Sequence, residues 1–240
     1  MVGDQKFTLR PLYLQVRDLV LQRITSGTWK PGTMLPAETD LARELGISSG
    51  TVRKALDALE AEHVVSRRQG KGTFVNDSTT EELVGRYDNI RDRNSRRLEG
   101  VLADSSMATG QANATEQERL RLDAGDDVIR IQRVRVSNDR PYMHEEVTLP
   151  ARLFPGLASR EQAPPRIVEL AQEFGLVLGR GVESLSVAAA CTRIAARLSI
   201  AEGTPVLRLD RTVSAIDGRP VEWRVATCHL PEEHYLVELV

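Results

Sequence analysis

The tightest constraint on the fold is a short turn, Gly46-Ile47-Ser48, that separates two stretches of helical periodicity. The apolar residues on either side recur at intervals of three and four, which is the spacing of one helix face. They are Leu41, Ala42 and Leu45 before the turn, and Val52, Ala55, Leu56 and Leu59 after it. Gly46 can end the first helix, and the Ser48 hydroxyl can cap the second by accepting a backbone N–H. Two short helices at this spacing predict a helix-turn-helix.

The segments on both sides of this motif complete a larger unit over residues 1–76. A helix is predicted to begin at Pro11 and to end near Gly27, with apolar residues at about every fourth position. Downstream, residues 64–75 predict a β-hairpin with a basic tip that contains two glycines. A hairpin in this place is the wing of a winged helix-turn-helix, so we expect residues 1–76 to bind DNA.

The charge distribution agrees with a first third that approaches nucleic acid. Residues 1–76 carry 11 Lys and Arg against 8 Asp and Glu, a net of +3, whereas residues 77–240 carry 21 against 26, a net of −5. A basic segment can approach polyphosphate more closely than an acidic one. No apolar run approaches the ~18 residues of a membrane span, and the chain has only two cysteines. We therefore expect no membrane contact, no disulfide scaffold and a cytoplasmic location.

The stretch from Pro11 to Val75 resembles the DNA-binding domain of the GntR family of bacterial regulators. The matching elements occur in order: PLY, the PGTMLPAE turn, the LARELGIS helix, the TVRKAL helix and the GKGTF wing. The resemblance implies that the TVRKAL helix enters the major groove, with Arg53 on a guanine edge or a phosphate and wing residues on phosphates. The candidate DNA-binding residues are Glu38, Thr39, Ser48, Ser49, Thr51, Arg53, Lys54, Arg67, Gly70, Lys71 and Thr73.

Three positions depart from the family pattern. Thr39 and Ser49 stand where the family often has arginines that touch DNA, and a hydroxyl cannot make a bidentate contact. Recognition is therefore expected to depend more heavily on Arg53 and the basic wing. His63 replaces a usual glycine just before the wing, and a positive φ at that position would cost some strain.

After a polar linker at residues 77–84, an internal repeat organises a second domain over residues 85–240. Gly125 aligns with Gly203 and Arg133 with Arg211, each pair 78 residues apart. Each unit has the pattern of a helix end, a glycine turn, a strand, a hairpin turn and a second strand.

Two such units predict an α+β domain with one mainly antiparallel sheet. We expect helices at 162–175 and 188–198 to cover the inner face of that sheet.

Strand alternation puts charged residues on the apolar face of this sheet. Arg133 and Arg135 share a face with Ile129 and Ile131, and Arg211 and Glu145 likewise alternate with apolar neighbours. Charges in such positions are costly unless they are paired or face a polar cavity. Two interpretations stay open: structural ion pairs, for example at a dimer interface, or a pocket for a small anionic or polar ligand.

The second domain also resembles a known module, the UTRA effector-binding domain of the HutC subfamily, whose fold is similar to that of chorismate lyase. The resemblance rests on "RVRVSNDRPYMHEEVTLP" and "LRLDRTVSAIDGRPVEW". It implies effector contacts from Arg133, Arg135 and Glu145, and the candidate effector-binding residues are Arg133, Arg135, Glu145, Arg211, Glu222 and Tyr235. The chain departs from the family at "LPEEHY", which keeps only Tyr235 of the usual closing string, and around "RNSRRLEGVLADSS".

An enzyme is the main rival interpretation. No two of the four histidines have metal-ligand spacing on a helix, and no phosphate loop or nucleophile elbow can be assembled. A pyridoxal-phosphate domain needs a Schiff-base lysine, and no lysine follows Lys71. We therefore expect no catalytic residues, no metal and no cofactor.

The sequence thus predicts a transcription regulator that acts as a homodimer on a pseudo-palindromic DNA site. Half-site centres are expected about 10 bp apart. The family resemblance implies that a small-molecule effector relieves repression. In the rival form of this hypothesis the second domain only dimerises and binds no effector.

Overall fold

The structure is a computed structural model that describes residues 10–76, 85, 87–98, 100–161 and 166–237. The chain divides into two compact units, residues 1–80 and 81–240, each with its own buried core. The predicted linker at 77–84 lies outside the described residues. No helix in the described ranges is long and apolar enough to cross a membrane.

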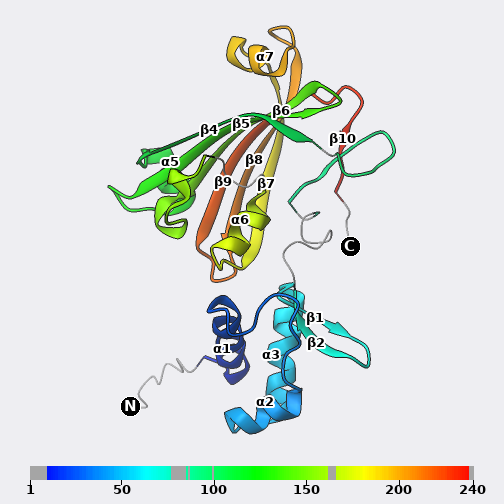
Figure 1. The fold of residues 1–240 in the computed structure, drawn as a ribbon, viewed down its shortest axis with the longest axis vertical. Coiled ribbons are helices and arrows are strands. Elements are labelled where there is room, and N and C mark those ends of the chain that lie inside the picture. The colour runs from blue at the N-terminus through cyan, green and yellow to red at the C-terminus, as the bar shows by residue number, and fades with distance from the viewer. Residues whose placement is uncertain (1–9, 77–84, 86, 99, 162–165, 238–240) are drawn as a thin grey trace, which may run out of the picture. The chain divides into compact units, whose positions relative to one another are not determined.

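The first unit consists of helices followed by a hairpin (Figure 1). Its elements are α1 Leu12–Thr25, α2 Glu38–Leu45, α3 Ser49–Ala61, β1 Val65–Arg68 and β2 Gly72–Val75. The predicted apolar faces form the core, with Val20, Leu41 and Leu56 almost fully buried. Helix α1 packs against α3, and β1 pairs with β2 in antiparallel register. The predicted winged helix-turn-helix is confirmed.

Local chemistry explains where these helices end. Gly46 follows α2 with φ +66°, a left-handed conformation that glycine adopts without a Cβ clash. The Ser48 hydroxyl caps α3 by accepting the Thr51 backbone N–H at 3.2 Å. After α3 the chain turns into the wing through His63, which has φ +58°. A histidine therefore adopts a left-handed conformation that glycine would adopt with less strain.

The second unit is built on a sheet whose described strands lie in the order β4-β5-β6-β9-β8-β7, every neighbouring pair antiparallel. The strands are β4 Val101–Gln111, β5 Asp127–Ser137, β6 Arg140–Pro150, β7 Leu178–Ala189, β8 Pro205–Ala215 and β9 Pro220–Cys228. A separate two-stranded ladder joins β3 Ile90–Arg91 to β10 His234–Tyr235. The helical segments are α5 Ala114–Leu120, η1 Ala151–Leu153, η2 Leu157–Ser159, α6 Ile167–Glu173 and α7 Thr192–Leu198.

The predicted repeat is visible in this topology. One half runs β4-α5-β5-β6 and the other runs β7-α7-β8-β9, so the two halves meet at the pair β6 and β9. The central register pairs Glu146 with Val225, and the strands continue symmetrically from there. In each half a hairpin turn with positive φ angles joins the last two strands. The residues with positive φ are Asn138 and Asp139 between β5 and β6, and Gly218 between β8 and β9.

The two helices expected on one face lie on opposite faces. Helix α6 packs on the face that carries Ile129, Ile131, Val147 and Leu149. Helix α7 instead packs on Val206, whose side chain points to the other face from its neighbour Leu207. The prediction that both helices cover the inner face is therefore wrong for α7. Residues 188 and 189 still belong to β7, so the helix starts later than expected.

Candidate DNA interface and ligand pocket

The amino end of α3 presents small hydroxyl residues to solvent. Ser48 and Thr51 are hydrogen bonded through their side chains at 2.9 Å, in addition to the Ser48 cap on the Thr51 N–H. No acidic residue lies in the first turn of α3. No carboxylate on this turn therefore offsets the positive end of the helix dipole. The free N–H groups of the turn and this dipole together favour a phosphate oxygen.

The predicted reader Arg53 is held by a carboxylate from another helix. Its Nε donates to Glu38 Oε2 at 2.9 Å, while its side chain stays 66% exposed. The predicted phosphate contact Arg67 is more strongly engaged: its Nη1 donates to Glu60 at 2.7 Å, and its Nη2 pairs with Asp57 and, at 3.5 Å, with Glu38. Arg67 therefore ties β1 to α2 and α3 in this structure.

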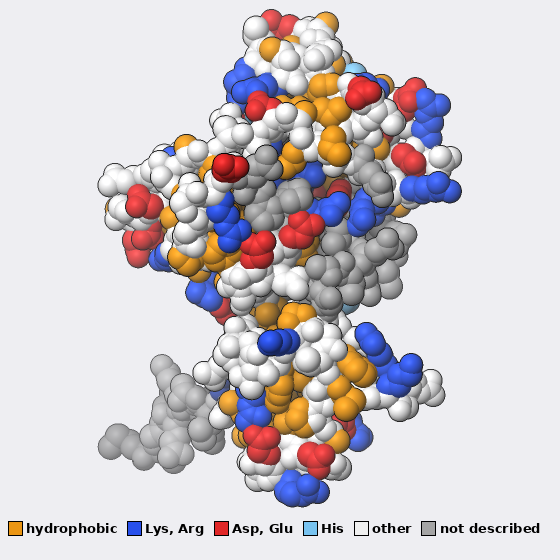
Figure 2. Space-filling model, in the orientation of Figure 1, with side chains coloured by type: hydrophobic (Ala, Val, Ile, Leu, Met, Phe, Trp, Pro, Cys, Tyr) orange, Lys and Arg blue, Asp and Glu red, His pale blue; other side chains and the backbone are white. Residues whose placement is uncertain are grey.

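Other basic residues of the first unit stack on aromatic rings. The Lys54 Nζ lies 4.4 Å from the centroid of the Tyr13 ring, and the Arg68 guanidinium lies 4.5 Å from that of Phe74. Gly70 and Gly72 both have positive φ, which lets the wing turn tightly. Figure 2 shows Lys and Arg side chains gathered on this hairpin. Thr39 and Lys71 are exposed.

In the second unit one carboxylate organises the charged face of the sheet. Glu145 is fully buried, and its Oε2 accepts from the Nε groups of Arg133 and Arg135 at 2.7 Å each. Its Oε1 accepts from Arg224 Nη1 at 2.9 Å. Burial alone would raise the pKa of the Glu145 carboxyl, but these three guanidiniums hold that pKa well below its usual range.

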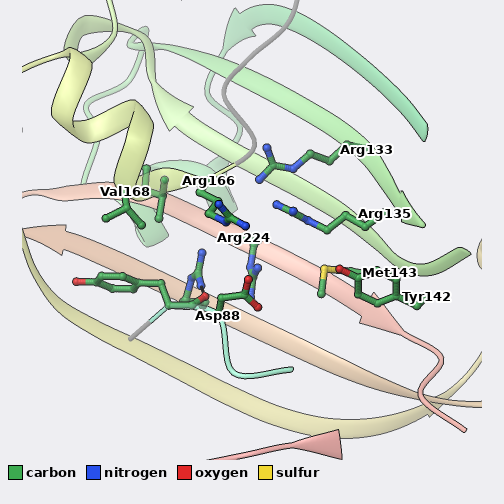
Figure 3. A pocket seen from close by; sticks show the side chains of 11 residues that line it. Asp88, Arg133, Arg135, Tyr142, Met143, Arg166, Val168 and Arg224 are labelled. Atoms are coloured by element: carbon green, nitrogen blue, oxygen red, sulfur yellow. Dashed lines mark hydrogen bonds between the residues drawn. The ribbon is translucent and has the colours of Figure 1, made fainter. Parts of the chain in front are cut away.

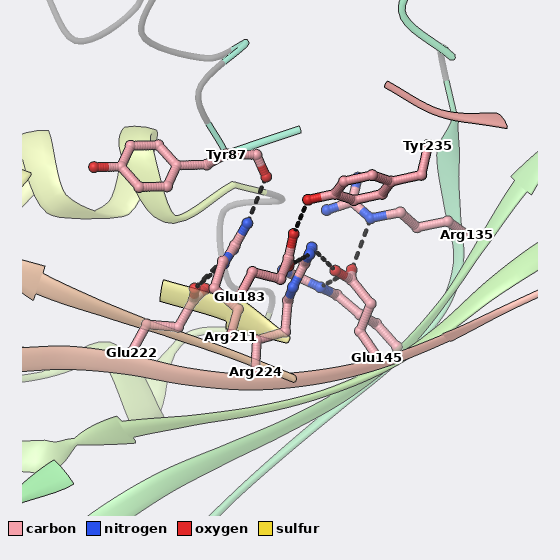
Figure 4. A network of polar contacts seen from close by, with 9 residues as sticks. Tyr87, Arg135, Glu145, Glu183, Arg211, Glu222, Arg224 and Tyr235 are labelled. Atoms are coloured by element: carbon pink, nitrogen blue, oxygen red, sulfur yellow. Dashed lines mark hydrogen bonds and ion pairs between the residues drawn. The ribbon is translucent and has the colours of Figure 1, made fainter. Parts of the chain in front are cut away.

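A second set of ion pairs lies beside the first (Figure 4). Arg211 donates to Glu222 at 2.7 Å and to the backbone carbonyl of Tyr87. Arg224 also donates to Glu183 at 3.0 Å, and Glu183 accepts from the Tyr235 hydroxyl. Burial and this hydrogen bond raise the pKa of Tyr235 to about 12. The six predicted effector residues therefore belong to one polar cluster, in which Tyr235 is half-buried and the other five are buried.

A small, partly open pocket of about 30 Å³ adjoins the cluster, under the start of α6 (Figure 3). Five of its lining residues are arginines and one is an acid: Arg133, Arg135, Arg166, Arg211, Arg224 and Asp88. Two guanidinium nitrogens here, Nε of Arg166 and Nε of Arg224, are buried and have no hydrogen-bond partner among the described residues. Burial also lowers the pKa of Arg133, although Glu145 opposes that change. Both interpretations drawn from strand alternation thus have a structural counterpart.

Comparison with known proteins identifies both units. Residues 12–75 match the family described as bacterial regulatory proteins, gntR family, and residues 105–232 match the UTRA domain. The chain belongs to the GntR family and carries a UTRA domain. This GntR-family protein is a DNA-binding transcription regulator.

Its relatives share most of their length with it. The chain is 31% identical over 217 residues to the HTH-type transcriptional repressor NagR of Bacillus subtilis, covering 88% of each protein. It is 27% identical over 218 residues to the mannosyl-D-glycerate transport/metabolism system repressor MngR of Escherichia coli, covering 89% of this chain and 90% of MngR. The crystal structure of PhnF from Mycobacterium smegmatis, 22% identical, has the same fold with a TM-score of 0.56 over 94% of this chain and 99% of PhnF. The named relatives NagR and MngR are repressors, which supports a regulatory rather than an enzymatic role.

Sequence reasoning missed several residues of the GntR-family regulator's pocket and of the polar cluster beside it. Arg224 follows Glu222 by two positions on β9, so strand alternation already carried a signal for it. Glu183 lies on the edge strand β7, whose polar and exposed sequence gave no strand signal. Asp88 and Arg166 lie outside the sheet strands, where alternation gives no information.

Proposed function

We propose that this regulator is a repressor that binds its operator as a homodimer and releases it when an anionic metabolite occupies the UTRA pocket. The observation that carries the proposal is the imbalance of the pocket wall, where five guanidiniums face one carboxylate, Asp88. Glu145, Glu183 and Glu222 do not line the pocket and are already bonded to four of these arginines, and Arg166 pairs with Glu169 on α6.

The proposed ligand class follows from the donors that are available. Arginine presents a planar fork that matches carboxylate and phosphate oxygens. The Nε groups of Arg166 and Arg224 are buried without partners among the described residues, and a buried unpaired donor costs about 1–3 kcal/mol. An acceptor oxygen in the pocket would remove that cost. The name of MngR links that relative to mannosyl-D-glycerate, which carries a carboxylate, and we propose a carboxylate or phosphate metabolite for this chain.

On DNA, we propose that α3 enters the major groove and the β1–β2 wing follows the backbone. Arg53 is the base reader, and Lys71 and Arg68 contact phosphates. Two copies would bind half-sites about 10 bp apart. We propose a location in the bacterial cytoplasm, because a regulator must reach the chromosome. We propose no catalytic activity for it.

One observation favours a second candidate, in which the UTRA domain binds no ligand. Glu145 already forms ion pairs with Arg133, Arg135 and Arg224, so the polar cluster can form as an ion-pair network without a ligand. In that case the domain would serve dimerisation only.

A ligand screen separates the two candidates. Sugar phosphates and organic acids are added to the protein, and the melting temperature and operator release are recorded. We expect at least one anion to raise the melting temperature, and Arg166→Ala to abolish that rise. Arg193→Ala is the matched control, because Arg193 is a surface arginine that pairs with Glu146 on the opposite face of the sheet. If no anion acts, or if both variants respond alike, the ligand-binding proposal fails.

A further inference from the structure

The acidic residue at the start of α2 has a role that the DNA-binding proposal does not explain. Glu38 contacts the recognition helix through Arg53 Nε at 2.9 Å and the wing through Arg67 Nη2 at 3.5 Å. Its side chain is 23% exposed and lines the groove between the start of α2 and the wing. Resting on the proposed function, we propose that Glu38 is a positioning residue that determines base specificity by acting through Arg53.

A carboxylate on this surface is unfavourable for DNA binding in general. It repels phosphates of every sequence alike, so its presence lowers non-specific affinity. Together Glu38 and Arg53 form a pair with no net charge, and such a pair is only weakly attracted to a phosphate. The same pair can still donate directed hydrogen bonds, so it favours a base edge over the backbone.

The geometry of the contact leaves the useful part of Arg53 available. A guanidinium has five N–H donors, and Glu38 takes only the one on Nε. The terminal nitrogens Nη1 and Nη2 project from a side chain that is 66% exposed. This end of the guanidinium can contact O6 and N7 of a guanine as a bidentate donor.

Fixing Arg53 before binding also lowers the entropy lost when DNA is bound. A free arginine side chain loses rotamer entropy when it is fixed on DNA, and the bond to Glu38 already restricts Arg53 in the unbound protein. Glu38 lies on α2, 15 residues from Arg53, so its position is set by the packing of two helices rather than by the recognition helix itself. Preorganisation of this kind favours the DNA sequence whose base edge matches the fixed guanidinium of Arg53.

The test uses selection from a library of random DNA duplexes with the full-length protein. Wild type, Glu38→Gln and Asp40→Asn are each selected and sequenced, and affinity for an enriched duplex and for a scrambled one is measured against salt. Asp40 is the matched control, because it is another acid in the first turn of α2 and pairs with Arg43 rather than with Arg53.

We expect Glu38→Gln to lose one guanine preference per half-site and to lower the ratio of enriched to scrambled affinity about tenfold. Its affinity for the scrambled duplex should rise at low salt, with a salt slope steeper by about one. Asp40→Asn should keep the wild-type base preference. An unchanged preference in Glu38→Gln, or an equal loss on both duplexes with a lower melting temperature, would overturn the proposal.

A double-mutant cycle tests whether Glu38 acts through Arg53. In the Arg53→Ala background, Glu38→Gln should cause no further loss of base preference, because the group that it positions is gone. Two additive losses would mean that Glu38 reads a base itself. If the wild-type protein enriches no sequence at all, the proposed DNA-binding function fails instead, so the two failures are distinguishable.

Discussion

At the residue scale, the second unit depends on the single carboxylate of Glu145. Three buried guanidiniums from two strands converge on it, Arg133 and Arg135 from β5 and Arg224 from β9. Removing one partner of a buried ion pair leaves an uncompensated charge, which costs far more than the intact pair contributes. Glu145 is therefore the position where a small change should have the largest effect on stability.

Glu145→Gln should lower the free energy of unfolding of the second unit by about 3–5 kcal/mol. Glutamine keeps the shape and one acceptor oxygen, so the change tests the charge rather than the packing. Urea unfolding at neutral pH measures it. Glu146→Gln is the control, since Glu146 points to the other face of the same strand and is 39% exposed, and it should cost less than about 1 kcal/mol. Equal losses in the two variants would contradict this account of the cluster.

The lowered pKa of Glu145 predicts how the free energy of unfolding changes with pH. The folded-state pKa of Glu145 lies well below the unfolded value of about 4.3, so its stabilisation is complete above that value. As the pH falls below about 5, the unfolded state takes up protons first and the free energy of unfolding declines. Wild type should therefore lose more stability between neutral pH and pH 3 than Glu145→Gln does. Because Glu116 and Asp217, whose pKa values are also lowered, are present in both proteins, the difference isolates Glu145.

At the element scale, strand alternation and helix periodicity predict most of the fold from the sequence alone. Alternation correctly places Arg133 and Glu145 on the face of Ile131, because a strand in a half-buried sheet buries every second residue. It fails for the edge strands β4 and β7, whose side chains, such as Val187 at 76% exposure, are not sorted into a buried and an exposed face. Periodicity identifies the apolar face of α7. It does not determine which face of the sheet this helix packs on, because both faces of the sheet offer apolar residues.

The end of α3 offers a test of local backbone strain. His63 has φ +58° after the helix, a position where glycine is favoured because it has no Cβ. His63→Gly should raise the free energy of unfolding of the first unit by about 0.5–1 kcal/mol. Ala61→Gly, two residues earlier and still in the helix, should lower it by about 1 kcal/mol. Chemical denaturation followed by helix circular dichroism compares the two, and the same sign in both would contradict the assignment.

At the scale of the whole molecule, the two units have separate cores and separate proposed ligands. The first buries residues such as Leu56 and Leu59, and the second buries Leu149, Phe154 and Leu209. A ligand that binds one folded unit stabilises that unit by mass action. The chain is therefore expected to behave as two thermodynamic units.

Thermal unfolding should show two transitions that respond to different additives. An enriched duplex should raise only the transition of the first unit, whereas an anion that binds the UTRA pocket should raise only that of the second. Calorimetry of the full chain measures both, and Arg166→Ala should remove the anion response alone. A single transition that shifts with either additive would show that the units unfold together.

The repeat in the UTRA domain has one further consequence. Its two halves meet at Glu146 and Val225, so the position of Glu145 in one half corresponds to that of Arg224 in the other. Arg133 and Arg211 also correspond. Arg133 lies opposite Glu145 on the neighbouring strand, whereas Arg211 lies opposite Arg224. A backbone with near two-fold symmetry would accept a molecule equally well in either direction. The exchange of charge between its halves removes that equivalence, so we expect the proposed metabolite, if its two ends differ, to bind in one orientation.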